Sequence, residues 1–235
     1  MTPPPRCYAL VPCAGVGARA GVAGPKQYAV LRDRTVVAHA LAALAAVPRL
    51  VATLVVLAPE DQAFEASAPG FGGERGWVAR CGGATRADSV AQGLQILRGR
   101  GVAETDWVLV HDAARCLLQP AWVERLIDAC LGDEVGGLLA LPLADTLKHA
   151  AVTCDGERVA ATLDRSHKWL AQTPQMFPLG LLQRALAQAG SGVTDDASAI
   201  EALGLAPLLV PGEIENLKLT WPADFALAAR LLETR

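Results

Sequence analysis

The chain has 235 residues, a length that suits one α/β domain with a single large core. Its net charge is −3, so the chain has no excess of basic residues that would favour binding to DNA, RNA or an anionic membrane. Any anion must therefore be bound by local cations. Although 52% of the residues are hydrophobic, the apolar runs 40–47 and 50–58 end at prolines, well short of the roughly 18 residues that cross a bilayer.

The first predicted element is a buried strand over 7–11, followed by a loop over 12–28 that contains four glycines. Glycines let consecutive backbone N–H groups approach an anion, and Arg19 and Lys26 would add fixed charge. We therefore predict a triphosphate-binding loop. A surface turn and a dinucleotide fingerprint at 15–20 are the alternatives, but Gly21, Gly24 and Pro25 oppose the helix that this fingerprint requires.

The same N-terminal stretch also imitates a secretory signal, with Arg6 before an apolar run and an A-x-A triplet at 18–20. We favour a cytoplasmic protein instead, because Pro12, Gly15 and Gly17 interrupt the apolar run.

The six cysteines form no C-x-x-C pair, which is typical of free thiols in a reducing compartment rather than of a zinc site.

The next segments predict an alternation of helices and buried strands. We expect an extended piece at 28–31, a helix capped by Thr35 through residue 46, a strand at 51–57, a short helix at 60–66 and a strand at 77–81. Thr85 and Asp88 form a capping-box pattern for a helix that runs to about residue 98. Beside this cap, Gly83 and Ser89 are candidates for reading a nucleobase edge; an ordinary capped turn is the alternative.

A strand over 107–110 leads directly into His111 and Asp112. A carboxylate at the tip of a central strand is suitably placed to hold Mg²⁺ or sugar hydroxyls, so Asp112 is a candidate metal ligand. The alternative is that Asp112 caps a helix within 120–131. For His111 we expect a structural role in the turn rather than the role of a general base.

The pattern changes after a strand at 137–141. Residues 142–172 predict a projecting β-arm, a hairpin that turns at 155–156. Because a two-stranded arm is marginally stable alone, we expect it to pack on a second copy of the chain and form a homodimer. Together these elements predict an α/β fold: one domain over 1–235 with a Rossmann-like, mostly parallel twisted sheet flanked by helices.

The C-terminal quarter predicts three further features. Helices are expected over 179–189 and from 194 onward, the second with Gly204 as its C-cap. Short strands are expected at 208–210 and 216–220, the latter carrying Lys218. Thr220 is expected to cap a closing helix that runs through residue 232.

Ten short motifs, taken in order, resemble those of the 2-C-methyl-D-erythritol 4-phosphate cytidylyltransferase family. They are Gly15-x-Gly17-x-Arg19, Pro25-Lys26-Gln27-Tyr28, Gly82-Gly83, Arg86-Ala87-Asp88-Ser89, Val110-His111-Asp112-Ala113-Ala114-Arg115, Asp145-Thr146, Asp164-Arg165, Thr173-Pro174-Gln175, Thr194-Asp195-Asp196-Ala197-Ser198 and Asn216-x-Lys218-x-Thr220. The resemblance implies a homodimeric, Mg²⁺-dependent enzyme of non-mevalonate isoprenoid synthesis. Such an enzyme joins CTP to 2-C-methyl-D-erythritol 4-phosphate and releases pyrophosphate.

The resemblance also implies residue roles. Arg19 and Lys26 would stabilise the transition state, while Lys218 and a partner subunit's arm residue equivalent to Arg165 would hold the attacking phosphate. The nucleotide pocket would include Ala14, Gly15, Gly17, Arg19, Lys26, Gly83, Ser89 and Asp112. The substrate pocket would include Asp112, Arg115, Thr146, Arg165, Thr173, Thr194 and Lys218. Mg²⁺ would be held mainly by the nucleotide phosphates.

Two alternative functions remain at this stage: a cytidylyltransferase for another polyol phosphate, such as ribitol 5-phosphate, and a catalytically silent nucleotide-binding protein. Four positions depart from the family pattern, namely Cys13, Ala20, Ala84 and Cys116. Cys13 and Ala84 lie beside the expected nucleotide, so they bear on selectivity for cytosine. None of the four changes a charge that the reaction needs.

Overall fold

The computed structural model describes residues 4–15, 24–153, 156–190 and 193–234. The described strands are β1 (Cys7–Pro12), β2 (Val30–Leu31), β3 (Arg34–Thr35), β4 (Leu50–Leu57), β5 (Gly76–Arg80), β6 (Trp107–Val110), β7 (Gly137–Pro142), β8 (Leu147–Thr153), β9 (Gly156–Leu163), β10 (Trp169–Pro178) and β11 (Leu208–Pro211). The described helices are the 3₁₀ turn η2 (Lys26–Tyr28) and the α-helices α1 (Val36–Ala45), α2 (Phe64–Ser67), α3 (Arg86–Gly99), α4 (Pro120–Cys130), α5 (Leu179–Gln188), α6 (Asp196–Glu201) and α7 (Pro222–Glu233).

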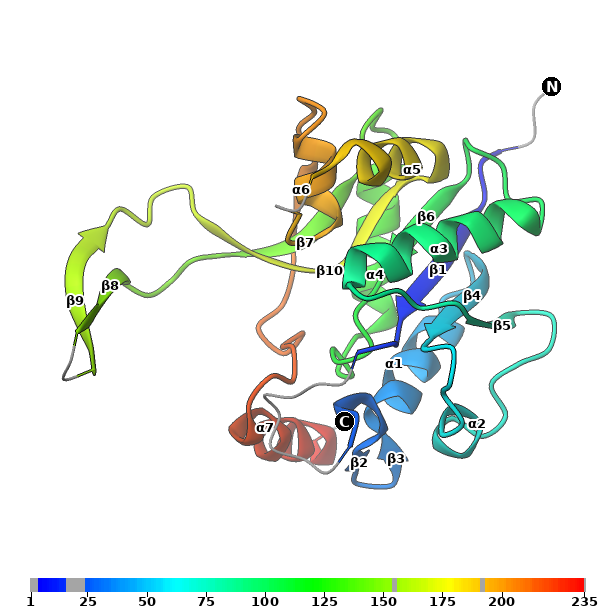
Figure 1. Ribbon diagram of the computed structural model, residues 1–235, viewed down its shortest axis with the longest axis horizontal. Helices are drawn as coiled ribbons and strands as arrows, with labels where there is room; N and C mark the ends of the chain where they lie inside the picture. The colour runs from blue at the N-terminus through cyan, green and yellow to red at the C-terminus, as the bar shows by residue number, and fades with distance from the viewer. Residues whose placement is uncertain (1–3, 16–23, 154–155, 191–192, 235) are drawn as a thin grey trace.

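Seven strands form the central sheet, in the order β11-β7-β10-β6-β1-β4-β5 (Figure 1). Neighbouring strands are parallel except at β10, which runs antiparallel between β6 and β7. The predicted mostly parallel sheet is confirmed. The strand β10 was not predicted, because residues 172–175 contain Pro174 and follow the arm.

Apolar side chains on both faces of the sheet explain why it forms. In β4 every residue except Val51 is buried, which is typical of a strand covered on two sides. Helices α3, α5 and α6 pack on one face, and α1, α2 and α4 pack on the other. The sheet is therefore a rigid platform whose loops at the carboxyl ends of the strands remain available for binding.

The chain reverses its direction of travel across the sheet at β1. From β1 it moves outward to β4 and β5, and it then returns to β6 on the opposite side of β1. The segments that follow β1 and β6 therefore diverge from neighbouring strand ends. In α/β sheets such a switch point is the usual place for a ligand.

Two predicted helix starts are confirmed at atomic detail. Thr35 Oγ1 accepts from the Ala38 amide at 3.2 Å, and Thr85 and Asp88 form the complete capping box of α3. The predicted short helix at 60–66 begins later, at Phe64, because Asp61 accepts the amides of residues 63 and 64 as the chain enters α2.

Three C-terminal predictions were wrong. The segment 216–220 is not a strand, because Arg115 binds the Asn216 carbonyl and Lys26 binds the Leu219 carbonyl in place of a neighbouring strand. Thr220 does not cap the last helix. The carboxylate of Asp224 accepts the amides of residues 220 and 221 instead, and the N-cap is Trp221.

The third error concerns the end of α6. Its C-cap is Ala202, and Gly204, with φ of +78°, follows two residues later. The glycine therefore turns the chain beyond the helix end rather than capping it.

Strands β8 and β9 pair with each other in a separate antiparallel sheet outside the central one. In Figure 1 this hairpin projects from the body of the molecule, reached through the outer ends of β7 and β10. Every residue of β9 is exposed, including Val159. Within one chain this β-arm has little apolar contact to stabilise it.

Candidate functional site

A cavity of about 280 Å³ lies at the switch point, where β1 and β6 end. Its walls come from five separated parts of the chain: the end of β1 and the segment after it, the turn η2, the segment that leads into α3 with the start of that helix, the residues after β6 and the segment that carries Lys218. Its lining residues are Pro12, Cys13, Ala14, Gly15, Lys26, Gln27, Gly83, Ala84, Thr85, Arg86, Ser89, Asp112, Ala113, Ala114 and Lys218. The fold thus gathers most of the predicted nucleotide residues in one place.

The start of the glycine loop is held by Gln27. The Nε2 group of this buried side chain donates to the Cys13 carbonyl at 3.2 Å and to the Gly15 carbonyl at 2.9 Å. Beside it, Lys26 Nζ donates to the Leu219 carbonyl at 2.8 Å. The predicted residues Gly17 and Arg19 lie outside the described residues.

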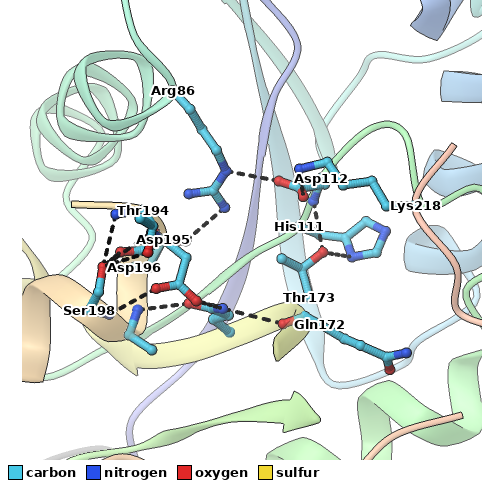
Figure 2. A network of polar contacts seen from close by, with 12 residues as sticks. Arg86, His111, Asp112, Gln172, Thr173, Thr194, Asp195, Asp196, Ser198 and Lys218 are labelled. Atoms are coloured by element: carbon cyan, nitrogen blue, oxygen red, sulfur yellow. Dashed lines mark hydrogen bonds and ion pairs between the residues drawn. The ribbon is translucent and has the colours of Figure 1, made fainter. Parts of the chain in front are cut away.

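Asp112 is held at both its backbone and its carboxylate. Its amide donates to Thr173 Oγ1 at 3.0 Å, and its two carboxylate oxygens lie 2.8 Å from Arg86 Nε and Lys218 Nζ, respectively (Figure 2). Burial alone would raise the pKa of Asp112, but the two cations outweigh burial and hold this pKa well below its usual range. Asp112 is therefore ionised at neutral pH.

Arg86 also contacts a second carboxylate. Its Nη2 group donates to Asp196 Oδ2 at 2.8 Å, and Asp196 is only 1% exposed. In the sequence, Arg86 is part of a family motif that predicts no role for it. Its partners lie 26 and 110 residues away along the chain, so no local pattern indicated the bridge.

His111 has a structural role in the turn after β6, as expected from the sequence. Its Nε2 lies 3.1 Å from the Arg115 carbonyl, which can only accept, so Nε2 carries the proton. Nδ1 then accepts from the Thr173 hydroxyl at 3.1 Å. Burial lowers the pKa of His111 to about 4, so the ring is neutral near pH 7.

Arg115 does not line the cavity. Its guanidinium donates to the Asn216 carbonyl at 2.6 Å and to the Ala171 carbonyl at 3.2 Å. Burial lowers the pKa of this arginine, although Asp112 opposes the effect. In this structure the predicted substrate residue holds together the segments that contain Ala171 and Asn216.

Gly83 and Ser89 line the cavity, but they bond to each other. The Gly83 amide donates to Ser89 Oγ at 3.1 Å, and this hydroxyl donates to the Thr85 carbonyl at 3.0 Å. Both groups therefore shape the turn before α3. Whether they also read a nucleobase stays a prediction.

Four other predicted substrate residues do not line this cavity either. One is the buried Thr173, which binds the Asp112 amide and His111 Nδ1. Thr194 lines a neighbouring cavity of about 410 Å³ together with Arg86, Asp195 and Asp196. Thr146 and Arg165 are exposed residues that lie directly before β8 and two residues after β9, at the same end of the paired hairpin. A single chain thus does not bring its own arm residues to Lys26 and Lys218.

In the switch-point cavity, Asp112 is the side chain suited to bind a divalent cation. Across the described residues, no group of three or more His, Cys, Asp or Glu side chains could hold a metal ion. Asp112 offers hard carboxylate oxygens, which suit Mg²⁺, but cations face both of them. This donor set fits an ion held mostly by the phosphates of a bound nucleotide.

In the described part of the chain, no helix is long and apolar enough to span a bilayer.

Comparison with known proteins adds independent findings. The family model for 2-C-methyl-D-erythritol 4-phosphate cytidylyltransferase matches residues 7–234. A protein of that name from Chromobacterium violaceum is 52% identical, over 97% of this chain and 98% of its own length. A bifunctional enzyme IspD/IspF from Albidiferax ferrireducens is 58% identical over 98% of this chain, which spans only 54% of that relative.

Solved structures agree with these sequence matches. The chain is similar to a crystal structure of 4-diphosphocytidyl-2C-methyl-D-erythritol synthase with a TM-score of 0.85 and 42% identity, over 97% of this chain and 98% of the other. A 2-C-methyl-D-erythritol 4-phosphate cytidylyltransferase from Thermus thermophilus gives a TM-score of 0.77 at 32% identity, over 97% and 99% of the two chains.

Proposed function

The chain belongs to the 2-C-methyl-D-erythritol 4-phosphate cytidylyltransferase family, and from this premise we propose that it is a nucleotidyltransferase that joins CTP to 2-C-methyl-D-erythritol 4-phosphate. The products are 4-diphosphocytidyl-2-C-methyl-D-erythritol and pyrophosphate, and the reaction serves isoprenoid precursor synthesis. The observation that carries the proposal is the meeting of Lys26, Asp112 and Lys218 around one cavity at the switch point of the sheet.

The reaction needs charge compensation more than acid or base catalysis. The acceptor phosphate is already an anionic nucleophile at neutral pH, and it attacks the α-phosphorus of CTP in line with the departing pyrophosphate. The barrier is largely the approach of two anions, which fixed cations lower by neutralising the phosphoryl oxygens. The neutral, fully bonded His111 is consistent with this mechanism, since no side-chain base is required.

Two lysines supply this charge from opposite ends of the sequence. Lys26 would stabilise charge that develops on the triphosphate, together with Arg19. Lys218, held by Asp112, would also bind the attacking phosphate, which it can reach because its side chain is 42% exposed and lines the cavity. Gly15 and Ala14 would lie against the nucleotide, since neither carries a bulky side chain.

Mg²⁺ would be required as the cofactor. When bound, it withdraws charge from the triphosphate oxygens and so favours departure of pyrophosphate. Asp112 is the residue that would contact it or the ribose hydroxyls.

The active unit would be a homodimer in the cytoplasm. Arg165 lies on the exposed β-arm, and in a dimer that exchanges arms it would reach the acceptor phosphate bound to the partner. Thr146 lies at the same end of the hairpin, since the neighbouring Leu147 pairs with Leu163, and would enter the partner's substrate pocket with it. The exposed apolar residues Val152 and Val159 support the proposal, since contact with a second subunit would bury them.

A pyrophosphate-release assay tests the proposed function. With CTP, Mg²⁺ and 2-C-methyl-D-erythritol 4-phosphate we expect turnover that is lost when the acceptor is omitted or EDTA is added. Faster turnover with ribitol 5-phosphate would identify a different polyol phosphate as the substrate. Tight CTP binding without pyrophosphate release from any acceptor would contradict the proposal and favour a nucleotide-binding protein without catalytic activity.

A further inference from the structure

Arg86 lies in the wall between two cavities. It lines both the 280 Å³ cavity at the switch point and the neighbouring 410 Å³ cavity that contains Thr194. Figure 2 shows its guanidinium between Asp112 on one side and Asp196 on the other. Both donor–acceptor distances are 2.8 Å, and each carboxylate receives a different nitrogen of the guanidinium.

The carboxylate of Asp196 is a fixed anchor. It is the first residue of α6, and its neighbour Asp195 forms a capping box with Ser198. The side chain of Gln175 in β10 connects this helix start to the sheet. Its Nε2 donates to Asp195 Oδ2 at 2.7 Å, and its Oε1 accepts from the Ala197 N–H at 2.8 Å. Arg86 is therefore held from the side that faces away from the switch-point cavity.

The other partner of Arg86, Asp112, lines the switch-point cavity, so fixing Arg86 also fixes a side chain in that cavity. Arg86 binds Oδ1 of Asp112 and thereby fixes the rotation of the carboxylate, which directs Oδ2 toward Lys218 Nζ. A bridge of this kind is poorly explained by stability alone. Desolvation of buried charges offsets much of their attraction, and apolar residues of similar volume often stabilise a fold as well or better.

We propose that Arg86 is a positioning residue of the cytidylyl-transfer site: anchored by Asp196, it acts through Asp112 to set the arrangement that the nucleotide and Lys218 require. The inference rests on the proposed function. It assigns a role in catalysis to Asp196, although that residue does not line the switch-point cavity.

Four variants test the bridge. Arg86→Lys keeps the charge, but a single ammonium group cannot reach both carboxylates in the same geometry. Asp196→Asn removes the charge of the anchor with little change in shape, and the double variant combines the two. Arg98→Lys is the matched control, since Arg98 lies on the same helix and forms an exposed ion pair with Glu104 at 3.1 Å.

We would measure the dissociation constant of CTP with Mg²⁺ by calorimetry, then kcat and the KM for the acceptor, and confirm folding by circular dichroism. Arg86→Lys is expected to weaken CTP binding by about fivefold and lower kcat by about tenfold, as for loss of a positioning contact. Asp196→Asn should change both quantities in the same direction. The double variant should be no worse than Arg86→Lys by more than about twofold, because the two residues act as one unit.

Three results would overturn the inference in a wild-type enzyme that binds CTP and turns over. One is an Asp196→Asn variant with normal CTP binding and kcat, which would mean that Arg86 acts without its anchor. Another is a double variant whose losses multiply. The third is an Arg98→Lys variant as impaired as Arg86→Lys. A wild-type protein that neither binds CTP nor releases pyrophosphate would instead contradict the proposed function itself.

Discussion

Charged side chains at the switch point form ion pairs with one another. Asp112 has two cationic partners, and Arg86 has two anionic ones. Because removing one member leaves an uncompensated buried charge, single substitutions in this network should affect folding as well as activity. Substitution of the part-buried Lys26 separates the two effects better.

Lys26 is the residue whose substitution tests the charge-compensation mechanism most directly. Lys26→Ala should lower kcat by at least about a hundredfold with the fold intact, as for loss of a donor that stabilises developing charge. The same loss is expected for Arg19→Ala. Steady-state kinetics with matched circular dichroism spectra would check both. Near-normal turnover in either variant would remove its assigned role.

His111 should make the stability of the protein depend on pH. Its folded-state pKa of about 4 lies below the ordinary value of 6.5, so the unfolded chain takes up a proton first as the pH falls. The free energy of unfolding should therefore decrease between about pH 6.5 and pH 4, by on the order of 3 kcal/mol from this group.

Urea denaturation of the wild type and of His111→Gln at several pH values measures this contribution. The wild type should lose more stability than the variant over that interval, whatever their difference at pH 7. Parallel pH profiles would show that His111 does not contribute the expected dependence.

Among the secondary-structure elements, α3 is the one that connects local sequence to the site. Its capping box fixes the helix start, and that start presents Arg86 and Ser89 to the cavity. The cap is encoded within four residues, whereas the contacts of Arg86 depend on two distant elements.

Thr85→Ala should reduce the free energy of unfolding by about 1 kcal/mol, because α3 loses the acceptor for the Asp88 amide. Thr220→Ala is the comparison variant, since Asp224 supplies the cap of α7 and the Thr220 hydroxyl makes an exposed hydrogen bond to the Lys218 carbonyl. Chemical denaturation should show the smaller change for Thr220→Ala. Equal changes would mean that the α3 cap contributes no special stability.

At the scale of the whole molecule, we propose that a second chain completes the site. Arg165 and Thr146 lie on an arm that extends away from the cavity formed by the same chain (Figure 1). A dimer with exchanged arms would combine Lys26 and Lys218 of one subunit with Arg165 of the other.

Mixing inactive subunits tests this arrangement. Arg165→Ala and Lys26→Ala subunits, unfolded together and refolded, should recover about a quarter of wild-type activity, because half of the dimers would hold one intact site of two. Lys26→Ala mixed with Lys218→Ala is the control, and it should show no recovery since both lysines line one cavity of one chain. Absence of recovery in the first mixture would place each site within a single subunit.

The sequence alone determined the elements whose signals are local. The continuous apolar run of β4, the cap of α1 and the capping box of α3 each depend on residues within a few positions, and the structure agrees with all three. The ordered motifs likewise identified the family, because each is short and contiguous.

The tertiary structure decided what depends on distant contacts. The loop form of 216–220 follows from carbonyls bound by Arg115 and Lys26, and the place of β10 follows from its pairing with β6 and β7. The bridge from Asp112 through Arg86 to Asp196 exists only after three remote segments meet at the end of the sheet. Side-chain charge and spacing in the sequence cannot specify such a meeting, because it is the packing of the sheet and helices that brings these groups within bonding distance.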